Sequence, residues 1–140
     1  MKLVLAVFLS LLLTGCISQN QADVKMGKGC AAGIDALIKD EGKQVATIKV
    51  ERYASETNSD GQLRRVTIEA IEKDGWLELD KEYSCLFEEQ WGPFKISHNA
   101  MLVQVNIDDR TIGRKDGKIV GNFEDFQRLS AAVANTVKRQ

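Results

Sequence analysis

The residue types that could carry chemistry in this 140-residue chain are few: three cysteines, one histidine and scattered carboxylates. A zinc site built from cysteine and histidine lacks ligands, because His98 is the only imidazole. As a general base, His98 would indicate a hydrolase, but no Gly-x-Ser-x-Gly nucleophile motif accompanies it. We interpret His98 as a polar residue at a strand irregularity, and we expect no catalytic residue, no metal and no other cofactor.

The carboxylates do not form a recognisable site either. Glu88 and Glu89 are neighbours in a predicted strand, so their side chains point to opposite faces and cannot work as an acid/base pair. A calcium loop that began at Asn106 would have Thr111 at the position where the sharp turn needs glycine. The formal charge of −1 argues against nucleic acid as a partner, since phosphate binding needs an excess of lysine and arginine.

The N-terminus carries the most specific pattern. Lys2 precedes an apolar run over residues 3–13, which is too short to cross a bilayer but has the length of a signal-peptide core. The run ends in Leu13-Thr14-Gly15-Cys16, which resembles the lipobox of bacterial lipoproteins. The resemblance implies transfer of diacylglycerol to the Cys16 sulfur, cleavage before Cys16, and acylation of the new N-terminus. The alternative is an ordinary secretory signal with a chance cysteine.

The residues after Cys16 bear on the final membrane. In the lipoprotein family, aspartate directly after the lipidated cysteine often signals retention in the inner membrane, and this chain has Ile17 and Ser18 there. The resemblance therefore implies the periplasmic side of the outer membrane, with the inner membrane as the alternative. Two or more acyl chains hold a protein firmly on a bilayer, whereas a single chain binds marginally.

With Cys16 lipidated, Cys30 and Cys85 are left as an even pair in an oxidising compartment. Such a pair predicts a disulfide, which would join the first predicted helix to the core face of a strand. A catalytic thiol is the weaker interpretation, because it needs a nearby base.

The periodicity of the remaining chain predicts one domain. We expect a signal peptide at 1–15, the lipidated cysteine and a polar tether at 16–28, and a single α+β domain at 29–140. Helices are predicted over 29–41 and from Asn122 to the C-terminus, with an antiparallel meander of four to six strands between them. Both helices should pack on one face of the sheet; a small barrel is the alternative. A change of phase in the alternating pattern predicts a bulge near His98-Asn99, and Phe94 and Ile96 are expected to begin a strand.

Two surface features suit contacts with a partner. Trp91 and Phe94 flank a Gly-Pro turn and would form an aromatic docking surface if both were exposed; otherwise one or both fold back on the core. Four basic residues in a predicted loop could contact anionic headgroups or another envelope polymer, or could simply be solvated. They are Arg110, Arg114, Lys115 and Lys118.

These features together predict a membrane-anchored, non-enzymatic binding or assembly module with a protein partner in the envelope. The alternative is an inhibitor or exclusion factor against an incoming enzyme or phage protein, since Tyr83-Ser84-Cys85 resembles the Tyr-x-Cys element of small periplasmic lysozyme-inhibitor lipoproteins. A hydrolase that uses His98 is the third and least favoured interpretation.

Overall fold

The computed structural model describes residues 15–58 and 61–138. Most of the predicted signal peptide, including Leu13 and Thr14 of the lipobox, lies outside the described residues. So do Ser59 and Asp60, which belong to the polar run 56–61 that predicts a turn. The elements, in chain order, are α2 (Gln19–Ile38), the 3-10 turn η2 (Lys39–Glu41), β1 (Lys43–Asn58), β2 (Gly61–Asp74), β3 (Leu77–Trp91), the 3-10 turn η3 (Pro93–Lys95), β4 (His98–Ile107), β5 (Arg110–Lys115), β6 (Lys118–Val120) and α3 (Phe123–Lys138).

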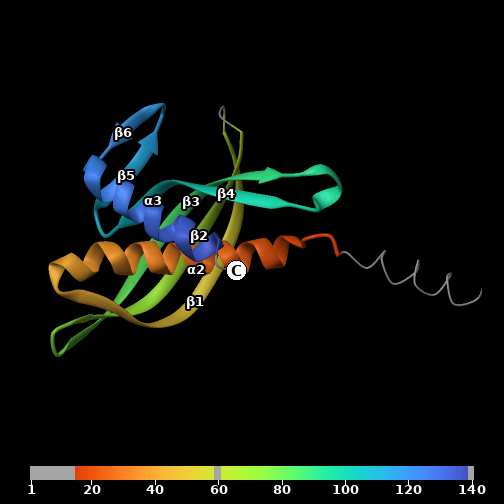
Figure 1. The fold of residues 1–140 in the computed structure, drawn as a ribbon. Helices are drawn as coiled ribbons and strands as arrows, with labels where there is room; N and C mark the ends of the chain where they lie inside the picture. Colours follow the sequence, from red (N-terminus) through yellow and green to blue (C-terminus); the bar gives the residue numbers. More distant parts are fainter. Residues whose placement is uncertain (1–14, 59–60, 139–140) are drawn as a thin grey trace, which may run out of the picture.

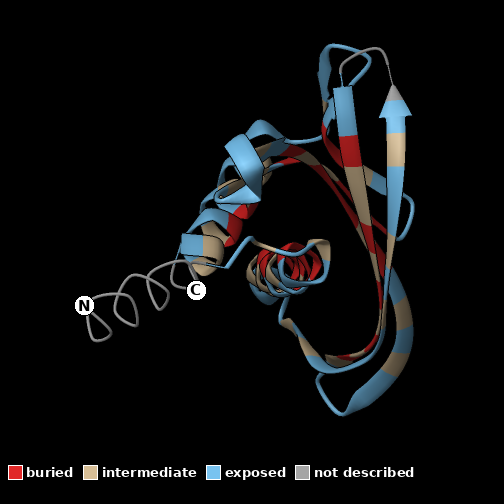
Figure 2. Cartoon of the chain, turned by 90° about the vertical axis from the view of Figure 1, so that its right-hand side faces the viewer, coloured by how far each residue is buried: buried red, intermediate tan, exposed pale blue. Residues whose placement is uncertain are grey.

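The strands form one six-stranded antiparallel sheet in the order β1-β2-β3-β4-β5-β6, each paired with the next along the chain (Figure 1). The sheet curves around α2, while α3 packs against α2 and against β4 and β5 (Figure 2). The predicted α+β meander between two helices is therefore confirmed, with six strands. Within the described chain β1 and β6 are the sheet's edges, so the alternative of a closed barrel is wrong.

The first helix begins ten residues earlier than predicted, and the prediction of a polar tether before it is wrong. The Ser18 side chain accepts a hydrogen bond from the Gln21 backbone, and the Gln21 side chain accepts one from the Ser18 backbone, which is a complete capping box. Ala22 and Met26 are fully buried. With Cys30 they form one buried helix face at intervals of four residues, which extends toward the N-terminus of α2. The many polar residues on the outer face of this segment made the apolar spacing hard to recognise in the sequence.

The second helix packs on the first through small residues. The predicted start at Asn122 is confirmed, because the Asn122 side chain accepts a hydrogen bond from the Glu124 backbone. The helical spacing of Phe126, Leu129, Val133 and Val137 predicts one apolar stripe, and Leu129 and Val133 of this stripe are buried. A Cβ atom at Gly33 would lie 2.9 Å from Val133, so this glycine, although a poor helix former, permits the close approach of the two helices.

The spacing of Tyr83, Cys85 and Phe87 at every second position predicts that they share the core face of β3, and this is confirmed because all three are buried. In β1 the alternation of Ala46, Ile48 and Val50 with polar residues predicts that these three face the core. This prediction is wrong, because Ile48 and Val50 are exposed. Two register shifts interrupt this edge strand, between Val45 and Thr47 and between Ile48 and Val50, so the alternation expected of one continuous strand does not hold through it.

The predicted bulge in β4 exists, but five residues later than expected. Leu86 pairs with Gln104 and Phe87 pairs with Leu102, so Val103 is the extra residue. The bulge restores the buried phase for Val105 and Ile107. The expectation that Phe94 begins a strand is wrong, because the preceding connection is the 3-10 turn η3.

The predicted disulfide is confirmed. Cys30 and Cys85 are bonded, with their Cα atoms 5.8 Å apart and a sequence separation of 55. The bond joins the middle of α2 to a central strand. Closing a loop of that length in the unfolded chain is worth about 4 kcal/mol in the loop-entropy model, which is a large share of the about 5–15 kcal/mol that stabilises a typical domain.

Candidate functional site

Cys16, the predicted lipidation residue, is exposed and has a free thiol. It lies directly before Ile17, whose backbone N–H donates a 2.8 Å hydrogen bond to the carbonyl oxygen of Lys95. Helix α2 then begins at Gln19. The segment that carries the expected lipid is therefore fixed against the β3–β4 connection, with no flexible spacer between Cys16 and the fold.

The β3–β4 connection, residues 92–97, is a tight turn that presents apolar side chains to solvent. Its backbone is closed by hydrogen bonds from Gly92 N to Ser97 O (2.9 Å), from Lys95 N to Gly92 O (3.1 Å) and from Ile96 N to Pro93 O (3.2 Å). The side chains of Phe94 and Ile96 project from it, with exposed fractions of 87% and 66%. We call residues 92–97 the anchor-side tip.

Trp91 behaves differently from Phe94. Its ring is partly buried against the core and tilts against the His98 ring, with centroids 4.4 Å apart, while Lys95 Nζ lies 5.5 Å from the Trp91 ring centre. One aromatic of the predicted pair therefore caps the core and the other points outward. The two do not form a common docking surface.

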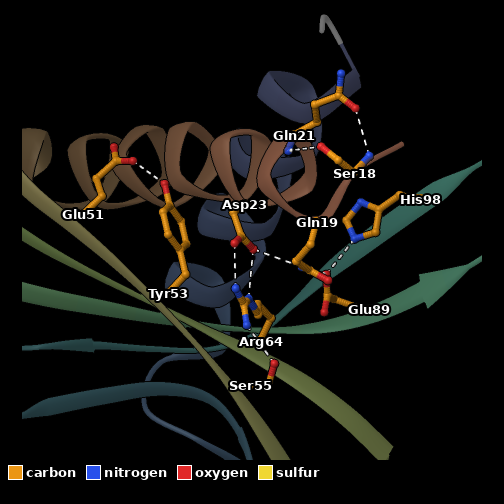
Figure 3. A network of polar contacts seen from close by, with 10 residues as sticks. All are labelled: Ser18, Gln19, Gln21, Asp23, Glu51, Tyr53, Ser55, Arg64, Glu89 and His98. Carbon is orange, nitrogen blue, oxygen red and sulfur yellow. Dashed lines mark hydrogen bonds and ion pairs between the residues drawn. The ribbon is translucent and has the colours of Figure 1, made fainter. Parts of the chain in front are cut away.

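A chain of buried polar contacts connects the first turns of α2 to the sheet (Figure 3). Its centre is a two-point ion pair: Arg64 Nε donates to Asp23 Oδ1 at 2.9 Å, and Arg64 Nη2 donates to Asp23 Oδ2 at 2.6 Å. The two side chains are 13% and 8% exposed. Arg64 Nη1 also donates to Ser55 Oγ at 2.7 Å. The side-chain hydrogen bond to Asp23 raises the pKa of Arg64 further above its ordinary value, so its charge is permanent.

Gln19 extends this chain toward the anchor-side tip. Its Nε2 donates to Asp23 Oδ1 at 3.1 Å and to Glu89 Oε1 at 3.0 Å. The same Glu89 oxygen lies 2.9 Å from His98 Nε2, and the Glu89 and His98 side chains are only 1% and 3% exposed. We call the set Gln19, Asp23, Arg64, Glu89 and His98 the helix-docking network.

The helix-docking network can position a helix, but it offers little access for a substrate. The His98 Nε2 atom is occupied by Glu89 and the ring is covered by Trp91. Glu88 and Glu89 lie on opposite faces as predicted, since Glu88 bonds to Arg114 at 3.1 Å on the other side of the sheet. His98 is the first residue of β4, and the strand irregularity expected there lies at Val103 instead.

A second buried acidic group lies near the opposite end of the sheet. Tyr83 donates from its hydroxyl to Glu72 Oε2 at 2.6 Å, and Glu72 is 1% exposed. The other carboxylate oxygen, Oε1, has no hydrogen-bond partner, although Lys43 Nζ lies 3.7 Å away. Burial and the hydrogen bond to Glu72 raise the pKa of Tyr83 well above its ordinary value.

The predicted basic loop is a β-hairpin, formed by β5 and β6. Arg110 pairs with Glu41 at 2.8 Å, next to the C-terminal end of α2, and Arg114 pairs with Glu88. Lys115 and Lys118 are exposed at the turn of this hairpin. Two of the four charges therefore have carboxylate partners, and Arg110 lies at the end of α2 opposite to the expected lipid.

The Tyr83-Ser84-Cys85 element belongs to the core. Tyr83 and Cys85 are buried, and the Ser84 hydroxyl is bonded to Asn106 at 3.1 Å. This environment does not favour an inhibitory contact with an incoming enzyme through these residues.

Four members of the helix-docking network were missed by the sequence reasoning: Gln19, Asp23, Arg64 and Glu89. The alternation held a signal for two of them, because Glu89 alternates in phase with Phe87 and Arg64 alternates in phase with Val66. Asp23 lies seven residues before Cys30, so a stripe at helical spacing includes it. Charged residues in these phases are candidates for buried ion pairs.

Comparisons with protein-family models, with curated proteins and with solved structures gave no match for this chain. Within residues 15–58 and 61–138, no helix is long and apolar enough to cross a bilayer. The same described residues contain no group of three histidine, cysteine or acidic side chains that could hold a metal ion.

A further exposed aromatic was not singled out in the sequence. Trp76 lies in the β2–β3 turn and is 94% exposed, and Leu77 beside it is also exposed. This turn is at the start of β3, whereas the anchor-side tip follows its end. We call Trp76 and Leu77 the distal tip.

Proposed function

We propose that the chain is a lipid-anchored lipoprotein of a bacterial envelope that acts as a non-enzymatic binding module. The observation that carries the proposal is the lipobox-like Leu13-Thr14-Gly15-Cys16, whose cysteine is exposed directly before the folded domain. The Cys30–Cys85 disulfide supports it, since such bonds persist in oxidising compartments. The sole imidazole, buried against Glu89, does not favour the hydrolase.

The distal tip is the best supported contact surface for a protein partner. Tryptophan is enriched among residues that dominate binding energy, and Trp76 is almost fully exposed at the turn of the β2–β3 hairpin. Its position at the start of β3 places it far from Cys16, so it extends toward the periplasm when Cys16 is in a bilayer. It replaces the Trp91 and Phe94 pair as the proposed contact with a protein.

The mass of the protein extracted from cell membranes tests the anchor. We expect loss of residues 1–15 and addition of acyl chains on Cys16, and Cys16→Ser should retain the apolar leader and carry no acyl mass. Ile17→Asp is expected to move the acylated protein from the outer to the inner membrane, as the resemblance implies. Full-length protein free in the cytoplasm, without acyl mass, would contradict the proposal.

Crosslinking in intact cells tests the contact surface. Recovery of a crosslinked envelope protein should fall at least about tenfold for Trp76→Ser, since loss of a dominant interface residue costs about 2 kcal/mol or more. Met101→Ser is the matched control, because Met101 is also exposed but lies on β4. Equal recovery from both variants would rule out the distal tip as the contact.

A further inference from the structure

The anchor-side tip carries the exposed side chains Phe94 and Ile96 next to the residue that is expected to be acylated. Ile17 is bonded through its backbone to Lys95, and Lys95 stands between Phe94 and Ile96 in the chain. Consecutive Cα atoms are about 3.8 Å apart, so Cys16 begins one short step from this contact. The lipid attachment point and the apolar tip therefore occupy the same end of the molecule (Figure 1).

We propose that Phe94 and Ile96 enter the lipid bilayer beside the acyl chains on Cys16, so that the domain rests directly on the membrane in one orientation. This inference rests on the proposed acylation. Acyl chains on Cys16 bring the bilayer surface to Ile17, and the hydrogen bond from Ile17 to Lys95 brings the anchor-side tip to the same level. A flexible spacer after Cys16 would let the anchor-side tip move independently of the acyl chains, but α2 begins at Gln19 and leaves no room for one.

The chemistry around the tip suits a lipid surface. An aromatic and a branched aliphatic side chain flank a lysine, and amphipathic lysine side chains place their charge among headgroups while their stems lie along apolar surface.

The backbone of the tip holds Phe94 in a conformation that most side chains avoid. Phe94 has φ 55° and Lys95 has φ 57°, both in the left-handed region. A bulky residue rarely adopts this region, and such positions persist where the surrounding structure or a function requires them. Here the conformation leaves Phe94 87% exposed rather than folded onto the core.

The distal tip serves as an internal reference for orientation. Trp91 ends β3 beside the anchor-side tip, whereas Trp76 precedes β3. A strand of 15 residues at about 3.3 Å per residue separates them by roughly 45–50 Å along its path. A domain docked through Phe94 and Ile96 therefore has one tryptophan near the lipid and the other remote from it.

The test uses the acylated full chain, purified from membranes and reconstituted in phosphatidylethanolamine and phosphatidylglycerol vesicles whose acyl chains carry bromine. Bromine quenches tryptophan fluorescence on close approach. Trp76→Phe leaves Trp91 as the reporter at the membrane end, and Trp91→Phe leaves Trp76 as the reporter at the distal end. We expect quenching of Trp91 to exceed that of Trp76 severalfold.

Variants of the tip then separate its role from that of the acyl chains. Phe94→Ser with Ile96→Ser should reduce the quenching of Trp91 by half or more, and should lower the partitioning of leader-free, non-acylated protein into the same vesicles by about tenfold or more. The matched control is Ile119→Ser with Phe123→Ser, which removes an exposed isoleucine and phenylalanine from β6 and the start of α3. The control should change neither quantity.

The outcomes are distinguishable. Acyl mass on Cys16 with equal quenching of the two tryptophans overturns the docking of the tip and leaves the lipoprotein proposal intact. Acyl mass with equal effects of the tip and control variants also overturns it, because exposed apolar area alone would then explain the partitioning. The absence of acyl mass overturns the proposed function, and this inference with it.

Discussion

The helix-docking network makes a sharp prediction about Asp23. Its carboxylate receives two hydrogen bonds from Arg64, and both side chains are largely buried. Asp23→Ala leaves the guanidinium without its main partner, and breaking a buried pair in this way costs about 3–5 kcal/mol. Alanine's better helix propensity offsets at most about 0.7 kcal/mol. We therefore expect a net loss of about 3 kcal/mol in the free energy of unfolding.

Urea denaturation with the disulfide intact measures this loss, provided that the dependence on urea concentration is unchanged. Asp80→Ala is the control, since Asp80 pairs with Lys49 at 2.6 Å on the exposed surface and should cost less than about 1 kcal/mol. A cycle that adds Arg64→Ala should show that the two buried changes are not additive. Two results would refute the role of the helix-docking network in holding α2. The first is an equal loss of stability for Asp23→Ala and Asp80→Ala. The second is additivity of the Asp23→Ala and Arg64→Ala effects within about 0.5 kcal/mol.

Three further predictions concern the core and the tip. The folded state raises the pKa of Tyr83 above its ordinary value of 10.0, so the neutral phenol is favoured in the fold. The contribution of Tyr83 to stability is therefore fully present below pH 10.0 and is lost as pH rises beyond it. Tyr83→Phe should reduce this loss in equilibrium unfolding across pH, and should cost about 1–3 kcal/mol at neutral pH because Glu72 loses its hydrogen bond. Replacing Cys30 and Cys85 by alanine should cost up to about 4 kcal/mol in urea denaturation, and two reactive thiols in denatured, unreduced wild-type protein would contradict the bond. Phe94→Asn should raise the free energy of unfolding by up to about 1 kcal/mol in thermal denaturation, because asparagine tolerates φ 55°. The same substitution should weaken binding to vesicles. A lower stability of the variant would show that the backbone at Phe94 is not strained.

The helix-docking network and the anchor-side tip both fix the position of the residues around Cys16 and the start of α2. Gln19 and Asp23 hold the first turns of α2 on the sheet, and Ile17 holds the residues before them on the tip. Loosening either contact gives Cys16 a flexible connection to the domain. The orientation on the membrane should therefore depend on Asp23 even though this residue is buried.

The order of elements and the cross-link could be predicted from local patterns. Alternation in β2 and β3 identified the buried residues Val66, Ile68 and Tyr83. Successive side chains in a strand point to opposite faces, so alternating apolar residues must lie on the buried face of the sheet. The pairing of Cys30 with Cys85 followed from their number once Cys16 was assigned to lipid. Such inferences need only the neighbours of each residue in sequence.

Errors arose where one residue changes the phase of a strand. The bulge at Val103 and the two register shifts in β1 depend on how the sheet curves around α2, which no window of a single strand records. The start of α2 was missed for a related reason. Its buried stripe is short and interrupted by polar residues, and it becomes a helix face only against the sheet.

The sequence by itself determined the lipobox-like motif at Cys16, the succession of helix, meander and helix, and the supply of two cysteines for one bond, because these depend on composition and local period. Only the tertiary structure decided that Asp23 meets Arg64, that His98 is buried against Glu89, and that Phe94 projects from the turn that contacts Ile17. Those facts join residues distant in sequence, and their energies depend on burial and distance, which arise only when the chain has folded.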